Sequence, residues 1–138
     1  MNEYRIADIS VGMTECFSKT ITADMMAQFL AICGDENPLH KDESFAQSQG
    51  FPSCVAYGML TASLISTLGG CYLPGKYCLI HSVEVKFTKP VFVGDVLTVT
   101  GEVTHVRTDW KIVEIKVTMR NQKNEIVLRG LLKAGVME

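Results

Sequence analysis

Hydrophobic side chains recur every three or four residues in an early segment of the chain, at Met25, Phe29, Ile32 and Cys33. This spacing is typical of one face of an α-helix. Thr22 precedes the segment and can cap the free amides of a first turn, and Gly34 follows it where a left-handed residue would end the helix. Asp42 is expected to cap a second, short helix over residues 44–47 that stops near Gly50.

Residues 56–68 form the longest helical candidate in the chain. The segment is apolar on most sides, and Gly69 and Gly70 follow it as expected terminators. A helix that is apolar on most sides is expected to be buried.

Beyond Pro74 and Gly75 the hydrophobic pattern changes to a period of two, in three segments: Val83, Val85 and Phe87; Val99, Gly101 and Val103; Ile115, Val117 and Met119. This alternation predicts β-strands. Turn-forming residues lie at 93–95, 108–109 and 121–124, so the second half of the chain is predicted to be an antiparallel meander.

Helices followed by strands predict an α+β fold, in one domain spanning residues 1–138, with the hydrophobic helix covering one face of an antiparallel sheet. Adjacent apolar residues at 112–113 and 131–132 interrupt the alternation of the strands. We therefore expect a second subunit to cover part of the other face, most simply in a homodimer.

The composition narrows the function without identifying it. Hydrophobic residues make up 47% of the 138 residues, which is enough for one buried core. The net charge of -2 and the dispersed Lys and Arg residues argue against a nucleic-acid partner. The start of the chain carries Glu3 and Asp8 where a signal peptide needs a basic region, and no segment reaches the roughly 18 apolar residues of a membrane span.

The five cysteines are odd in number and include no Cys-x-x-Cys pair: Cys16, Cys33, Cys54, Cys71 and Cys78. Such spacing does not indicate a disulfide framework. We expect reduced, mostly buried thiols in a cytoplasmic protein.

The segment 34–40 places a carboxylate and an imidazole five residues apart, at Asp35 and His40. Asn37 and Pro38 between them favour a tight turn, so the two groups are expected to face one another across a short irregular loop. A carboxylate and an imidazole differ in basicity and can divide proton removal and proton donation between them. The same residues also suit an ordinary turn after a helix, and spacing alone does not decide between these interpretations.

Three other patterns in the sequence are weaker evidence for a binding site. Residues 70–77 have the glycine and lysine spacing of a phosphate-binding loop, but they follow a helix and lack the Ser or Thr that binds magnesium. A calcium loop opening at Asp35 fails, because Leu39 and His40 occupy its next ligand and its glycine positions. His40, His81 and His105 lie in different predicted elements, so we expect no metal site.

Two longer segments are similar to motifs of a known family: residues 33–42, Cys-Gly-Asp-Glu-Asn-Pro-Leu-His-Lys-Asp, and residues 57–60, Tyr-Gly-Met-Leu. They resemble the MaoC-like, (R)-specific enoyl-CoA hydratases. The likeness continues through residues 73–76 and 87–95 and covers most of the chain from about residue 25 onward. The family implies a hotdog fold, in which a long central helix is wrapped by a curved antiparallel sheet, and a dimer with acyl-thioester sites near the subunit interface.

The resemblance also implies roles for matching residues. Asp35 and His40 would activate water for syn addition to a trans-2-enoyl-CoA, and Gly58 would donate its backbone amide to the thioester oxygen. Asn37, Tyr57 and Ser63 are candidate substrate contacts, although Ser63 suits a helix-packing bond equally well. Tyr57 departs from the family pattern, because histidine commonly precedes the Gly-Met pair.

The expected activity is reversible hydration of trans-2-enoyl-CoA to (R)-3-hydroxyacyl-CoA without a cofactor. Two alternatives stay open: hydrolysis of an acyl-CoA thioester, and acyl-CoA binding without catalysis. The sequence does not fix the acyl chain length, the carrier (coenzyme A or acyl carrier protein), or whether the oligomer is a dimer or a dimer of dimers.

Overall fold

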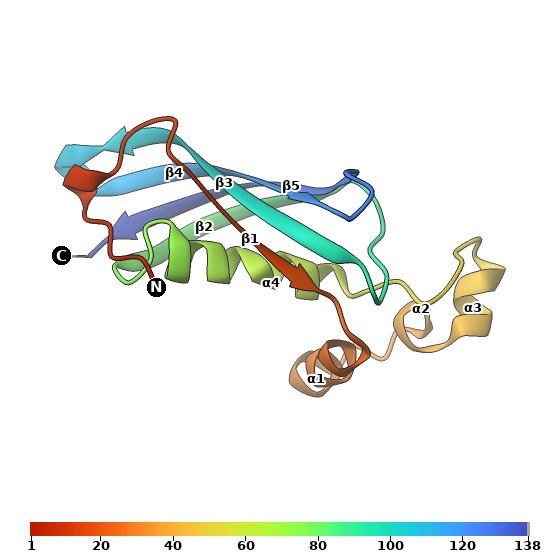
Figure 1. Cartoon of the computed structure of the whole chain (residues 1–138). Coiled ribbons are helices and arrows are strands. Elements are labelled where there is room, and N and C mark those ends of the chain that lie inside the picture. Colours follow the sequence, from red (N-terminus) through yellow and green to blue (C-terminus); the bar gives the residue numbers. More distant parts are fainter. Residues whose placement is uncertain (138) are drawn as a thin grey trace.

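One curved antiparallel sheet of five strands packs against a long helix, α4 (Gly58–Thr67), in the computed structural model, which describes residues 1–137 (Figure 1). The strands are β1 (Thr14–Thr20), β2 (Cys78–Phe87), β3 (Val96–Arg107), β4 (Ile112–Arg120) and β5 (Ile126–Val136). Three other helices precede α4: α1 (Ala23–Cys33), α2 (Pro38–Lys41) and α3 (Glu43–Ser48). This arrangement confirms the predicted α+β class and the helix wrapped by a sheet.

The strand order is β1-β3-β4-β5-β2, and every neighbouring pair is antiparallel. The predicted meander is therefore correct for β3, β4 and β5 only. The prediction was wrong for β2, which pairs with β5 at one edge of the sheet, far from β3. It also missed β1, an edge strand in which polar residues predominate. Periodicity assigns side chains to a face but does not identify the neighbouring strand.

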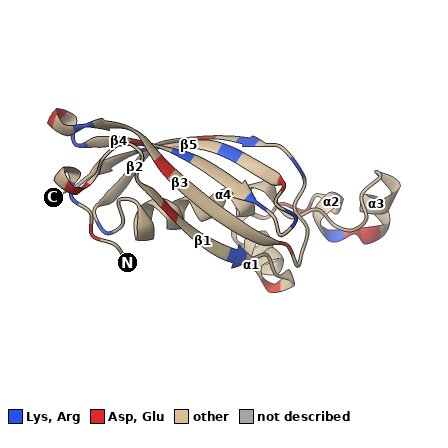
Figure 2. Ribbon diagram, turned by 45° about the horizontal axis from the view of Figure 1, so that its top comes forward, with Lys and Arg blue, Asp and Glu red and all other residues tan. Residues whose placement is uncertain are grey.

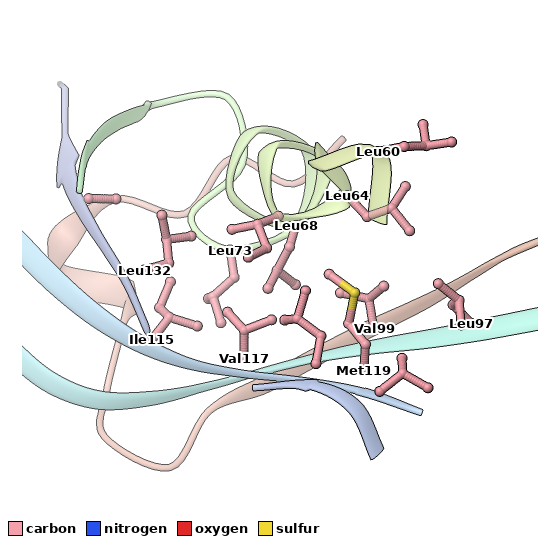
Figure 3. Close-up of a cluster of buried hydrophobic side chains, with 14 of the residues drawn as sticks. Leu60, Leu64, Leu68, Leu73, Leu97, Val99, Ile115, Val117, Met119 and Leu132 are labelled. Carbon is pink, nitrogen blue, oxygen red and sulfur yellow. The ribbon is translucent and has the colours of Figure 1, made fainter. Parts of the chain in front are cut away.

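The core lies between α4 and the sheet. Leu64 of α4 and Leu68, which directly follows α4, face Val99, Ile115 and Val117 of the strands (Figure 3). A Cβ atom added at Gly101 would lie 2.9 Å from Cδ2 of Leu68, so glycine on β3 allows the helix to approach closely.

The end of α4 differs from the prediction. Gly69 and Gly70 do not stop the helix, which continues as a π-helical turn over Leu68–Tyr72. Leu73 N–H donates to the Leu68 carbonyl and Gly75 N–H to the Gly69 carbonyl, and these bonds satisfy the terminal carbonyls. Gly69 is buried, and a Cβ there would lie 3.1 Å from Sγ of Cys78, so close packing explains this glycine.

One face of α4 is not buried within the single chain. Met59 is 66% exposed, and Ser63 and Ser66 are also exposed. The expectation that the whole helix is buried was therefore wrong for this face.

The helices α1, α2 and α3 lie beyond the end of the sheet, next to the start of α4 (Figure 1). The expected caps are present: Thr22 accepts a hydrogen bond from Met25 N–H, and Gly34 has the left-handed φ of 73°. The predicted apolar face of α1 is only partly correct, because Ile32 and Cys33 are exposed and Met26 is the buried residue.

All five cysteines are free, as expected, but none is buried: Cys16 and Cys33 are exposed and the others are half-buried. Lys and Arg lie among Asp and Glu along the strands rather than apart from them (Figure 2). Within residues 1–137, no helix is long and apolar enough to cross a membrane.

Candidate active site

Two successive side-chain caps shape the segment after α1. The Asp35 carboxylate accepts a hydrogen bond from Asn37 N–H (3.0 Å), and the Asn37 side chain accepts one from Leu39 N–H (2.9 Å). Asn37 thereby caps α2, whose first residue is Pro38. His40 consequently lies on this short helix, and the expected irregular loop is limited to residues 34–37.

The fold brings Asp35 and His40 together, as predicted. The His40 Nε2 atom lies 3.8 Å from Oδ2 of Asp35. The imidazole is 14% exposed and the carboxylate 47% exposed, so the pair stands at the edge between protein and solvent.

A second contact selects the tautomer of the imidazole. His40 Nδ1 lies 2.7 Å from the carbonyl oxygen of Val55. A carbonyl oxygen only accepts hydrogen bonds, so Nδ1 carries a proton; in the neutral tautomer that this contact selects, the lone pair is on Nε2, the atom nearer Asp35. A separation of 3.8 Å is too long for a direct hydrogen bond but suits a water molecule that contacts both groups at about 2.8 Å.

Tyr57 contacts both residues of this pair. It is 3% exposed, its hydroxyl donates to the Asp35 carbonyl (2.8 Å), and its ring centroid lies 4.2 Å from that of His40. Burial raises the pKa of the Tyr57 phenol, and the nearby Asp35 charge raises it further, so the hydroxyl remains a donor. The residue that departs from the family pattern thus connects both members of the pair.

Gly58 is the first residue of α4, and the preceding Tyr57 makes no side-chain cap. No acceptor for the Gly58 N–H is present in the part of the chain that the structure describes. A free amide at a helix N-terminus carries a partial positive charge and suits an oxyanion. A Cβ at this position would lie 3.2 Å from Cε1 of Phe87, so glycine here also makes room for that ring.

Two hollows meet at His40, Gly58 and Phe87. The first, of about 300 Å³, contains Asp35 and Tyr57 in its wall. The second, of about 280 Å³, extends between the start of α4 and residues 87–91. We call these the Asp35 hollow and the Thr61 hollow, since Thr61 lines the second.

A wider apolar groove of about 530 Å³ adjoins the Asp35 hollow. It shares Phe29, Met59 and Phe87 with that hollow and continues between α4 and β2. A long apolar chain leaving the Asp35–His40 pair would therefore have a continuous path along α4.

The remaining predicted contacts are placed differently. Ser63 lines the groove, and its hydroxyl donates to the Leu60 carbonyl (2.5 Å). This bond within the helix matches the second of the two roles expected for Ser63. Asn37 lines neither hollow and shapes the backbone through its cap. Among residues 1–137, no group of three or more His, Cys, Asp and Glu side chains is arranged to hold a metal ion.

Several residues of the site were not predicted from the sequence. Val55, through its carbonyl, and Thr61, through its side chain, belong to the site, but neither residue is part of a recognisable sequence motif. Phe87 was predicted only as part of a strand, and nothing in the linear sequence indicates that this strand reaches the start of α4.

Comparison with known proteins shows the family. Residues 11–126 match the family model described as MaoC like domain. The chain is 38% identical over 122 residues to an (R)-specific enoyl-CoA hydratase of Aeromonas caviae, covering 88% of this chain and 91% of that protein. It is 35% identical over 123 residues to a 3-hydroxybutyryl-CoA dehydratase of Methylorubrum extorquens, covering 89% and 78%.

Solved structures agree in fold. The (R)-hydratase of A. caviae superposes with a TM-score of 0.88 at 36% identity, covering 93% of this chain and 97% of that one. An R-hydratase of Pseudomonas aeruginosa in the unliganded form gives a TM-score of 0.90 at 30% identity, covering 97% and 86%.

Proposed function

This chain belongs to the MaoC-like domain family, and on that premise we propose that it reversibly hydrates trans-2-enoyl-CoA to (R)-3-hydroxyacyl-CoA. The observation that carries the proposal is the 3.8 Å gap between Asp35 Oδ2 and His40 Nε2, beside the free amide of Gly58. Relatives at 35–38% identity over nearly 90% of the chain bear the names of (R)-specific enoyl-CoA hydratase and 3-hydroxybutyryl-CoA dehydratase, and they support this reading.

Asp35 and His40 would hold and activate the water. As the water oxygen bonds to the β-carbon, the pair takes one of its protons and a proton is delivered to the α-carbon, so the reaction consumes only water and substrate. The unprotonated Nε2 of His40 is the natural acceptor, because Val55 holds the ring proton on Nδ1. Because Asp35 Oδ2 and His40 Nε2 lie only 3.8 Å apart, the hydroxyl and the proton would come from the same place, which supports addition of both to the same face of the double bond.

Gly58 would stabilise the intermediate charge. Attack at the β-carbon shifts electron density onto the thioester oxygen before the α-carbon is protonated. A fixed backbone amide at a helix N-terminus meets that charge without reorganisation. The acyl chain would then lie along the apolar groove between α4 and β2.

We also propose that the protein is a homodimer or a dimer of dimers. The edge strand β2 exposes four apolar side chains: Leu79, Ile80, Val83 and Phe87. A second copy pairing with this edge would satisfy its backbone groups and cover these side chains. Met59 and Phe87 line the Asp35 hollow and are themselves exposed, so a second copy that covers them would place the site at the subunit interface.

We also propose a cytoplasmic location, which rests on the cysteine pattern.

The test is loss of the conjugated-enoyl absorbance when the purified protein meets crotonyl-CoA, followed by chiral analysis of the product. We expect the (R)-3-hydroxy thioester and no free thiol. Thiol release without hydration would indicate a thioesterase instead. Saturable binding of enoyl-CoA without either reaction would indicate a non-catalytic binding protein and would contradict the proposal.

A further inference from the structure

The side chain of Phe87 lies where three spaces near the start of α4 meet. Phe87 lines the Asp35 hollow, the Thr61 hollow and the apolar groove, and among residues 1–137 no other residue lines all three. It is 52% exposed within the single chain, so much of its aromatic surface is free to contact a bound molecule. A molecule that extends from one of these spaces into another therefore passes the ring.

The ring packs directly on the start of α4. A Cβ atom added at Gly58 would lie 3.2 Å from Cε1 of Phe87, 3.3 Å from Cζ and 3.6 Å from Cδ1. Even a methyl group at Gly58 would therefore crowd the ring. Phe87 and Gly58 thus form one wall, and the Gly58 amide in that wall is the proposed donor to the thioester oxygen.

The backbone that carries the ring is fixed by neighbouring strand contacts. Phe87 pairs with Leu128 of β5 in the register of the sheet. The next residue, Thr88, donates its N–H to the Val127 carbonyl (3.0 Å) and its hydroxyl to the Ile126 carbonyl (2.6 Å). The ring can therefore yield to a substrate only by rotation about its own side-chain bonds, toward a less favourable rotamer.

The proposed reaction places one substrate atom beside this ring. The thioester oxygen would lie at the Gly58 amide, and the β-carbon would lie near the water between Asp35 and His40. The α-carbon is bonded to both the carbonyl carbon and the β-carbon, so it lies between these two anchors. The two hollows meet at this position, and the residues that they share are His40, Gly58 and Phe87.

We propose that the Phe87 ring excludes substituents on the α-carbon, so that the protein hydrates 2-enoyl thioesters that are unbranched at that carbon. This inference rests on the proposed hydratase function. A methyl group on the α-carbon would have to displace the ring or move the thioester oxygen away from Gly58. Closely packed sites reject an added methyl group, because the neighbouring side chains move only at a cost.

The test measures kcat/KM for crotonyl-CoA and for 2-methylcrotonyl-CoA with the wild type, Phe87→Ala and Phe87→Leu. The readout is the ratio of the two values for each protein, because the added methyl group lowers the intrinsic reactivity of the double bond equally in all of them. Phe87→Ala should shift this ratio toward the branched substrate by about tenfold or more, the usual effect of one methyl group in a pocket. Phe87→Leu should shift it less, since leucine keeps part of the volume, and it tests the inference independently of the folding of Phe87→Ala.

Two controls separate this role from a general loss of apolar surface. Leu79→Ala should keep the wild-type ratio, because Leu79 is 51% exposed on the same edge strand and lines none of the three spaces. The second control is a substrate, trans-2-hexenoyl-CoA, whose additional carbons lie beyond the β-carbon. Phe87→Ala should change its kcat/KM relative to crotonyl-CoA much less than it changes that of 2-methylcrotonyl-CoA.

An unchanged ratio in folded Phe87→Ala and Phe87→Leu variants would overturn the inference. An equal gain for trans-2-hexenoyl-CoA would also overturn it, because the ring would then restrict the groove as a whole. Both results leave the hydration of crotonyl-CoA by the wild type intact. A wild-type protein that hydrates no enoyl-CoA would instead overturn the proposed function, so the two failures are distinguishable.

Discussion

The helical segment that carries Asp35 and His40 and the sheet with α4 are stabilised in different ways. In α1, α2 and α3 only Met26 and Ala46 are buried, and caps from Thr22, Asn37 and Asp42 shape the backbone. The sheet and α4 instead enclose a continuous apolar core. The proposed catalytic residues therefore lie on a polar, locally folded segment, and the stability resides mainly in the neighbouring core. Substitutions in the two regions should separate stability from activity.

The largest effect is expected in the core, from Leu68→Ala. Leu68 is fully buried between α4 and the sheet, so its truncation removes apolar contacts and leaves a cavity. The free energy of unfolding should fall by about 3 kcal/mol. Urea denaturation measures this loss, and an unchanged midpoint would show that the core is not where the stability resides.

The next effect is on activity alone, from His40→Ala. Turnover should fall by at least about a hundredfold, a loss typical of an acid/base residue, while the Tm changes little. His105→Ala is a matched control, because His105 Nδ1 lies 3.0 Å from a Glu114 carboxylate oxygen on the sheet and outside both hollows. Equal losses in the two variants would contradict a special role for the Asp35–His40 pair.

A smaller effect is expected from Tyr57→Phe, which joins the two regions. The variant keeps the ring that packs on His40 and removes only the hydroxyl that donates to the Asp35 carbonyl. Loss of one hydrogen bond of about 1 kcal/mol should lower kcat roughly fivefold if the bond positions the carboxylate. Steady-state kinetics beside thermal melting would decide this, and a lower Tm with unchanged kcat would restrict Tyr57 to a structural role.

The contrast between the regions also explains what could be predicted from the sequence. The caps at Thr22, Gly34 and Asp42 and the approach of Asp35 to His40 depend on neighbours within a few residues, so turn and helix chemistry predicted them. The periodic strands were likewise predicted.

Long-range partners could not be predicted in this way. The Tyr57 hydroxyl reaches Asp35 across 22 residues, and β2 lies beside β5 because of chain topology, which periodicity does not encode. The edge strand β1 was missed because its polar residues hide the alternation. The continued turn after α4 was missed because glycines that serve packing look the same in sequence as glycines that end a helix.

The central claim is that Asp35 and His40 act together on one face of an enoyl thioester. The most direct test is hydration of crotonyl-CoA in deuterium oxide by the wild type and by Asp35→Asn, with the configuration at both new centres determined by NMR. We predict an (R)-3-hydroxy product with deuterium and hydroxyl added to the same face, and at least about a hundredfold less product from the variant. Addition to opposite faces, or near-normal turnover by a folded Asp35→Asn variant, would contradict the account.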